Sequence, residues 1–266
     1  MKKLFILACS LLSVISTTAQ IVPLPKSESY TEGEFTITDK SCLVYNSRVR
    51  DAATYLLNYL PFKQILSSQK VMDGDVVLSV NTFMEPEAYR LTVDNKNITI
   101  VGGGYGGVFN GIQTLLQLLP ADVYNGKRKL PVTVPCCTIE DNPKFDYRGF
   151  MLDVARKFFS LDYLKEQIKV LSFYKMNEFQ IHLNDNGFPQ FFDNDWNKTY
   201  SAFRLESNRF PGLTAKDGSY SKEEFKESVN KARIHVMSGE DFERRFQEFV
   251  IKPAETAKVK KLTPAD

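Results

Sequence analysis

Two apolar segments in the second half of this chain are separated by a helix-like segment, and this order strongly constrains the fold. The apolar segments cover residues 147–154 and 177–183, and an amphipathic pattern over 161–173 follows Ser160. Strand, helix and strand at this spacing predict a βαβ unit. The two strands of such a unit run parallel, because the helix carries the chain back to the edge where the first strand began.

Polar residues follow both predicted strands at the points where they end. Asp153 and Arg156 lie at the end of the first strand, and the residues of 184–187 (Asn-Asp-Asn-Gly) follow the second. Binding and catalytic groups of parallel sheets gather at the carboxyl ends of the strands. The pattern therefore predicts a functional site at this edge, with both polar clusters on the same side.

The first half of the chain has a different pattern, in which short strand-like segments are mixed with two helices. Alternating segments predict strands at 35–38, 75–80, 89–93 and 98–101, and the last two form a hairpin around a polar turn. Helical stripes cover 49–60, ended by Pro61, and 107–119, ended by Pro120. We predict an α+β domain that has an antiparallel sheet with helices on one face.

A glycine-rich turn joins the hairpin to the second helix. Gly102, Gly104 and Gly107 have the spacing of a dinucleotide-binding loop, in which backbone amides approach a pyrophosphate. However, the strand before them belongs to an antiparallel hairpin, and no parallel strand returns after the helix. We interpret the glycines as a site of close strand-to-helix packing and expect no cofactor. A nucleotide-binding oxidoreductase stays open as a further hypothesis.

Composition argues against several classes of partner. The chain has 34 basic and 32 acidic residues and a net charge of +2, which is too weak a field to indicate nucleic acid or an anionic membrane. Cys42, Cys136 and Cys137 have neither the number nor the spacing of a disulfide framework or a metal site. We expect buried thiols, no metal and no nucleic-acid partner.

The N-terminus is typical of an export signal. Residues 1–19 begin with two lysines, continue with an apolar stretch over 4–15 and end in small residues up to Ala19. The stretch is shorter than the about 20 apolar residues that a membrane span needs. We predict cleavage after Ala19 and a periplasmic or secreted protein without a membrane span, while Cys9 leaves lipoprotein processing open.

Several motifs resemble glycoside hydrolase family 20, the β-N-acetylhexosaminidases. They are FDYRGFMLDVARKFF and YKMNEFQIHLNDNGF, together with EAYRLTV, GVFNGIQTLLQLLP and YSKEEF. The resemblance covers about residues 21–227. It implies the family's N-terminal α+β domain at 20–140 and the first two strands and helices of a (β/α)8 TIM barrel at 141–227. Residues 228–266 read as a divergent, charged helical tail.

The resemblance also implies a substrate class and roles for several residues. The family removes terminal N-acetylglucosamine or N-acetylgalactosamine from glycans by substrate-assisted retaining hydrolysis. Arg148 matches the family's arginine for the sugar's 3- and 4-hydroxyls, although an ion pair with a neighbour such as Asp146 is the alternative. Asp185 matches the acidic residue that supports the catalytic pair.

The roles of the remaining candidates stay open. His182 either supports the catalytic residues or is a core histidine. Asp153 and Arg156 would form a supporting pair beneath the site. Trp196 is interpreted as loop packing.

The family's catalytic Asp-Glu pair lies in a His-x-Gly-x-Asp-Glu motif, which does not occur in these 266 residues. The most similar segment, Gly239-Glu240-Asp241, has the glutamate before the aspartate, which is the wrong order. A barrel typically needs about 250 residues, more than follow Glu140. We therefore predict an incomplete barrel, no hydrolysis by this chain alone, and an open edge that a partner would cover. The alternative is a non-catalytic glycan-binding or interaction protein.

Overall fold

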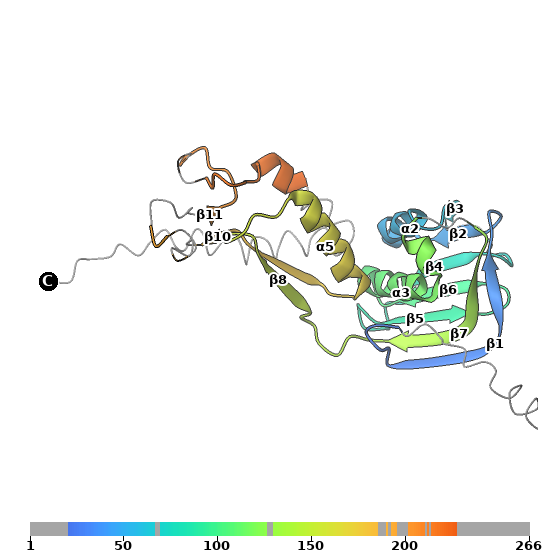
Figure 1. Ribbon diagram of the computed structural model, residues 1–266. Coiled ribbons are helices and arrows are strands. Elements are labelled where there is room, and N and C mark those ends of the chain that lie inside the picture. The colour runs from blue at the N-terminus through green and yellow to red at the C-terminus, as the bar shows by residue number, and fades with distance from the viewer. Residues whose placement is uncertain are drawn as a thin grey trace, which may run out of the picture.

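The computed structural model describes residues 21–66, 70–126, 130–185, 190, 193–195, 202–210, 212 and 214–227. Figure 1 shows a broad sheet with helices beside it and a smaller group of elements around β8 and α5. We call these the N-terminal sheet unit and the β8–β9 unit. Within the described residues, no helix is long and apolar enough to cross a membrane.

The N-terminal sheet unit contains seven strands in the order β1-β7-β5-β6-β4-β2-β3. Its elements are β1 (Ser27–Ile37), β2 (Cys42–Tyr45), η1 (Ser47–Val49), α2 (Arg50–Leu57), β3 (Lys63–Leu66), β4 (Val76–Val80), β5 (Tyr89–Val93), β6 (Ile98–Gly102), α3 (Tyr105–Leu118), α4 (Ala121–Tyr124) and β7 (Val132–Asp141). The predicted hairpin is confirmed, because β5 and β6 pair antiparallel from Tyr89–Gly102 to Val93–Ile98.

The sheet is mixed, so the prediction of an antiparallel sheet is wrong for half of it. Strands β1, β7, β5 and β6 pair antiparallel, whereas β6, β4, β2 and β3 pair parallel. The cause is the path of the chain: α2 lies between β2 and β3 and returns the chain to the same end of the sheet. In addition, β6 inserts between β4 and β5.

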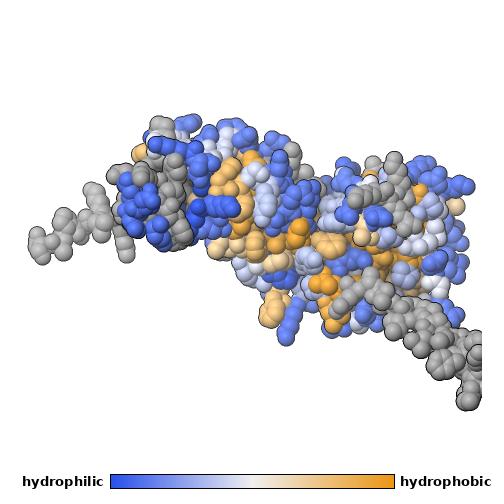
Figure 2. Space-filling view, in the orientation of Figure 1, coloured by the Kyte–Doolittle hydropathy of each residue, from blue (hydrophilic) through white to orange (hydrophobic). Residues whose placement is uncertain are grey.

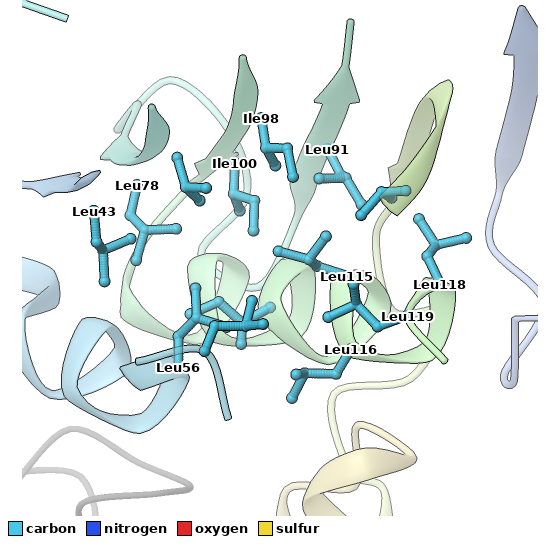
Figure 3. Close-up of a cluster of buried hydrophobic side chains, with 14 of the residues drawn as sticks. Leu43, Leu56, Leu78, Leu91, Ile98, Ile100, Leu115, Leu116, Leu118 and Leu119 are labelled. Carbon is cyan, nitrogen blue, oxygen red and sulfur yellow. The ribbon is translucent and has the colours of Figure 1, made fainter. Parts of the chain in front are cut away.

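The two predicted helices cover one face of the sheet, as expected. Helix α3 contacts β4, β5 and β6, and α2 packs against α3 and β2. Figure 3 shows Leu56 of α2 and Leu115 of α3 pointing toward the side chains of Leu78 and Ile100. Burying each such side chain contributes roughly 1.5–3 kcal/mol. Cys136 and Cys137 are buried in β7, whereas Cys42 is partly exposed.

The glycine-rich turn is filled by the protein's own backbone. A Cβ atom at Gly107 would lie 2.1 Å from the carbonyl oxygen of Ala88. The amide of Gly107 donates to the Pro86 carbonyl at 3.1 Å, and that of Gly103 to the Ala88 carbonyl at 2.9 Å. These amides are the groups that a pyrophosphate would need, so the contacts support the packing interpretation of the glycines.

The β8–β9 unit confirms the predicted βαβ arrangement. It comprises β8 (Gly149–Asp153), α5 (Leu161–Phe173) and β9 (Glu178–His182), and the two strands pair parallel. Ser160 begins α5 by accepting a hydrogen bond from the Tyr163 amide at 3.2 Å. A short antiparallel pair, β10 (Asn184–Asp185) and β11 (Ala202–Phe203), follows β9.

The two faces of the β8–β9 pair differ. One face carries Leu152, Phe179 and Ile181, which pack with Leu164 of α5 in a cluster that also contains Val154, Tyr220 and Phe225. Because side chains alternate along a strand, Met151, Asp153, Gln180 and His182 belong to the opposite face. Several large apolar side chains in and just before β8 are exposed to solvent. Figure 2 shows hydrophobic residues, coloured orange, on the surface between the two units.

The hydrophobic cores of the two units differ in size, and this difference leads to a prediction for limited proteolysis. The large cluster of the N-terminal sheet unit includes residues from all its long strands, whereas the second cluster has four buried members. We expect trypsin to cut first after a Lys or Arg beyond Asp141 and to leave a resistant fragment that contains the N-terminal sheet unit, detected by mass spectrometry. Equal resistance of the two units would contradict this prediction.

Candidate functional site

Four of the five predicted site residues meet at the carboxyl ends of β8 and β9. The guanidinium of Arg156 contacts two carboxylates, with Nη1 2.6 Å from Asp153 Oδ2 and Nη2 2.6 Å from Asp185 Oδ2. The Nε2 atom of His182 lies 2.7 Å from the same Asp185 oxygen. We call Asp153, Arg156, His182 and Asp185 the carboxyl-end cluster.

Strand pairing and a tight turn explain why these residues meet. Asp153 is directly opposite His182 in the parallel register of β8 and β9. The Asp153 carboxylate accepts hydrogen bonds from the backbone amides of Ala155 at 2.9 Å and Arg156 at 3.0 Å, which turns the chain after the strand. Burial acts to raise the pKa of the Asp153 carboxyl, but the hydrogen bonds from Arg156 and Ala155 outweigh it and lower the pKa.

The carboxyl-end cluster is accessible from solvent and rich in directional polar groups. About a third of the Arg156 side chain and a quarter of each carboxylate side chain are exposed. Guanidinium donors and carboxylate acceptors at one edge suit a ligand with several hydroxyl groups. Among the described residues, no group of three or more His, Cys, Asp or Glu side chains is arranged to hold a metal ion.

Arg148, the predicted sugar-binding residue, lies away from this cluster. It precedes β8 at the amino end, five residues or about 16 Å along the chain from Asp153. Its guanidinium forms a bidentate ion pair with Glu87 at 2.8 and 3.0 Å, and its Nε donates to the Lys175 carbonyl at 2.8 Å. Arg148 therefore joins the two units, and the partner of its ion pair is Glu87, not Asp146. Its role in sugar binding stays a prediction.

Lys175 is a second link between the units, and the sequence patterns did not indicate it. Its side chain is almost fully buried at the end of α5, with Nζ 3.2 Å from the Tyr89 hydroxyl and 3.8 Å from the Asp141 carboxylate. The Tyr89 hydroxyl in turn lies 2.6 Å from Thr114 Oγ1. Burial lowers the pKa of the Lys175 ammonium to about 8, against the opposing attraction of Asp141.

Comparisons with known proteins assign the family. The family model described as "Glycosyl hydrolase family 20, domain 2" matches residues 18–142. The model described as "Glycosyl hydrolase family 20, catalytic domain" matches residues 145–247. The chain belongs to glycosyl hydrolase family 20. It therefore carries the family's domain 2 followed by sequence of its catalytic domain, and both units of the structure fall within these matches.

Curated relatives of this family-20 chain include two named "Beta-hexosaminidase". The protein of Porphyromonas gingivalis is 33% identical over 203 residues, which cover 73% of this chain and 24% of the relative. The protein of Vibrio furnissii is 33% identical over 200 residues, which cover 75% of this chain and 30% of the relative. The chain thus spans about a quarter to a third of the length of these relatives.

Solved structures of family-20 enzymes share the fold of this chain. The β-N-acetylhexosaminidase of Streptomyces coelicolor is 28% identical with a TM-score of 0.68, and the match covers 84% of this chain and 46% of that one. The exo-β-N-acetylglucosaminidase of Vibrio harveyi, solved in complex with N-acetylglucosamine, is 25% identical with a TM-score of 0.68; the match covers 85% and 36%. These likenesses support the α/β fold, while an incomplete barrel stays a prediction.

Other sequence predictions fall on parts of the chain that are not described. These are the export signal at 1–19 with Cys9, Asn186 and Gly187, Trp196, and the tail at 228–266 with Gly239-Glu240-Asp241. Their roles stay predictions.

A separate cavity of about 840 Å³ lies at the junction of the two units of this family-20 chain. It is lined mainly by apolar residues of α3, α4, β7 and α5, including Leu116, Leu119, Tyr124, Pro135 and Phe173. None of the residues in its lining belongs to the carboxyl-end cluster. The cavity is therefore distinct from the candidate site.

The buried lysine yields a pH prediction. Its pKa is about 8 in the folded protein, against about 10.4 in an unfolded chain, so between these values the unfolded state binds more protons. Stability should therefore rise with pH above about 8, by on the order of 1–2 kcal/mol up to pH 9.5 relative to Lys175→Met. Urea unfolding of both proteins measures the difference.

Lys169→Met is the matched control, because Lys169 is an exposed lysine on α5, the helix that precedes Lys175. Its stability should follow that of the wild type across this pH range. Parallel pH curves for the wild type and Lys175→Met would contradict the assignment.

Proposed function

We propose that this chain forms part of a glycoside hydrolase of the β-N-acetylhexosaminidase type, and that its carboxyl-end cluster binds the terminal N-acetylhexosamine of a glycan. The observation that carries the proposal is Arg156, bridged between Asp153 and Asp185 at the carboxyl edge of a parallel sheet. The names of the relatives support the reaction type, and the N-acetylglucosamine complex of the Vibrio harveyi enzyme supports the substrate class.

Each member of the cluster has a role in this proposal. Arg156, not Arg148, donates hydrogen bonds to the sugar hydroxyls, since its planar guanidinium presents several donors in a fixed geometry. Asp153 holds the guanidinium from the strand side and stays charged because of its lowered pKa. Asp185 couples Arg156 to His182 and accepts hydrogen bonds at the mouth of the site.

Hydrolysis of this type needs groups beyond the cluster. The 2-acetamido oxygen of the substrate attacks the anomeric carbon, an Asp orients the acetamide, and a neighbouring Glu protonates the departing glycosidic oxygen. No His-x-Gly-x-Asp-Glu motif that would supply this pair occurs in the 266 residues. We therefore expect residues 1–266 alone to bind the sugar without cleaving it.

Cleavage in this proposal requires a partner that supplies this pair and covers the edges of the β8–β9 pair that have no neighbouring strand among the described residues. We also propose that the protein is exported, because residues 1–19 have the pattern of a signal peptide.

Calorimetry with N-acetylglucosamine tests the assignment of the two arginines. Arg156→Gln should weaken binding at least about tenfold, because a charge-assisted hydrogen bond is worth roughly 1.5–3 kcal/mol. Arg148→Gln is the matched control and should leave the affinity within about twofold while lowering the unfolding midpoint, since it breaks the ion pair with Glu87. The reverse pattern, with affinity lost only in Arg148→Gln, would refute the assignment.

An activity assay tests the expected lack of cleavage. The purified chain should release no p-nitrophenol from p-nitrophenyl N-acetyl-β-glucosaminide above the buffer rate, because its sequence contains no His-x-Gly-x-Asp-Glu motif to supply the acid and the acetamide-orienting residue. Turnover that scales with protein concentration and survives repeated purification would overturn this expectation.

A further inference from the structure

We propose that Arg204 is a positioning residue for sugar binding: it connects the carboxyl ends of β8 and β9 and thereby sets the place of Arg156 relative to Asp185. The inference deepens the proposed function and rests on it for the identity of the ligand. Arg204 lies directly after β11 (Ala202–Phe203), far along the chain from the turn that it holds.

The side chain of Arg204 holds the turn after β8. It is only 1% exposed, its Nε donates to the Val154 carbonyl at 2.7 Å, and its Nη2 donates to the Ala155 carbonyl at 2.9 Å. Val154 and Ala155 are the two residues between Asp153 and Arg156. The guanidinium therefore binds the Val154–Ala155 and Ala155–Arg156 peptide groups, which lie between the two β8 members of the carboxyl-end cluster.

The backbone of Arg204 holds the end of β9 at the same time. Its amide donates to the Leu183 carbonyl at 3.0 Å, one residue after His182. The preceding β11 residues pair with β10, where Asp185 is opposite Ala202. One residue thus connects the strand end that carries Arg156 with the strand end that carries His182 and Asp185.

The turn is held from its other side as well. The amides of Val154 and Ala155 donate to the His182 carbonyl at 3.2 and 3.0 Å. Because Arg204 binds the carbonyls and the Arg156 amide donates to the Asp153 carboxylate, the Val154–Ala155 and Ala155–Arg156 peptide groups have hydrogen bonds at both ends. Little freedom remains for the turn, so the direction of the Arg156 side chain is set before any ligand arrives.

Asp217 and Gly218 complete the environment of the buried guanidinium. Nη1 donates to an Asp217 carboxylate oxygen and to the Gly218 carbonyl at 2.8 Å, and Nη2 reaches the other Asp217 oxygen at 3.1 Å. All five N–H groups of Arg204 therefore have an acceptor, and the buried charge has a counter-ion. The hydrogen bond from Arg204 lowers the pKa of the Asp217 carboxyl.

The number of acceptors explains why this position needs arginine. A lysine ammonium has three donors on one atom and cannot reach the Val154, Ala155 and Asp217 acceptors in their separate directions. Arg204→Lys would keep the charge but release the turn. A shift of Arg156 by about 1 Å is enough to weaken a contact that depends on geometry by an order of magnitude or more.

The test combines hydrogen exchange with calorimetry on the full chain. In Arg204→Lys, the amides of Ala155 and Arg156 should exchange at least about tenfold faster relative to the amides of Leu164 in α5 and Tyr174 at its C-cap. The affinity for N-acetylglucosamine should fall at least about tenfold. The comparison with α5 matters, because a loss of stability alone would speed all amides of the β8–β9 unit equally.

Two further variants make the test decisive. Asp217→Asn keeps the size of a side chain that is 40% exposed and should accelerate the same two amides to a smaller extent, which decides the matter if Arg204→Lys does not fold. Arg209→Lys, at an exposed arginine five residues further on, should change neither exchange nor affinity.

Unchanged exchange at Ala155 and Arg156, or an equal acceleration in α5, would overturn the positioning role. If the wild type does not bind N-acetylglucosamine, the proposed function fails, whereas the exchange data still report whether Arg204 holds the turn.

Discussion

The ion pair between Arg148 and Glu87 is the interaction on which the arrangement of this molecule depends. Within the described residues, the parallel sheet of the β8–β9 unit has two strands and a small core, so it cannot bury its surfaces by itself. The bidentate pair, together with buried Lys175, connects this unit to the large core of the N-terminal sheet unit. These contacts anchor the amino end of β8, at the opposite end of the strand from the proposed sugar site.

The two ends of β8 thus have different physical tasks. At the amino end, an arginine is paired with a carboxylate from the other unit and donates to backbone carbonyls, which favours a structural role. At the carboxyl end, Arg156 lies between two carboxylates and is partly exposed. This division follows the general rule that parallel barrels keep their stabilising contacts at one end of the strands and their functional groups at the other.

The sequence predicted best those features that depend on local patterns. The bounds of α5, the parallel pairing of β8 with β9 and the β5–β6 hairpin all follow from periodicity, capping and turn residues. The parallel half of the first sheet was not predicted, because strand order depends on which distant segments pair. Glu87 is 61 residues from Arg148, and Arg204 is about 50 residues from the carbonyls it binds. No local sequence pattern predicts such contacts. The apolar neighbours of Arg204 in Ala-Phe-Arg-Leu do, however, indicate that its charge is buried.

The central claim is that a sugar meets Arg156 and that Arg148 holds the units together. The most direct measurement is a titration of the isotope-labelled chain with N-acetylglucosamine, followed by NMR of backbone amides and arginine Nε–H groups. The account predicts saturable shifts at Arg156, His182 and Asp185, with Arg148 and Glu87 unchanged. Shifts confined to Arg148 and Glu87 would contradict it.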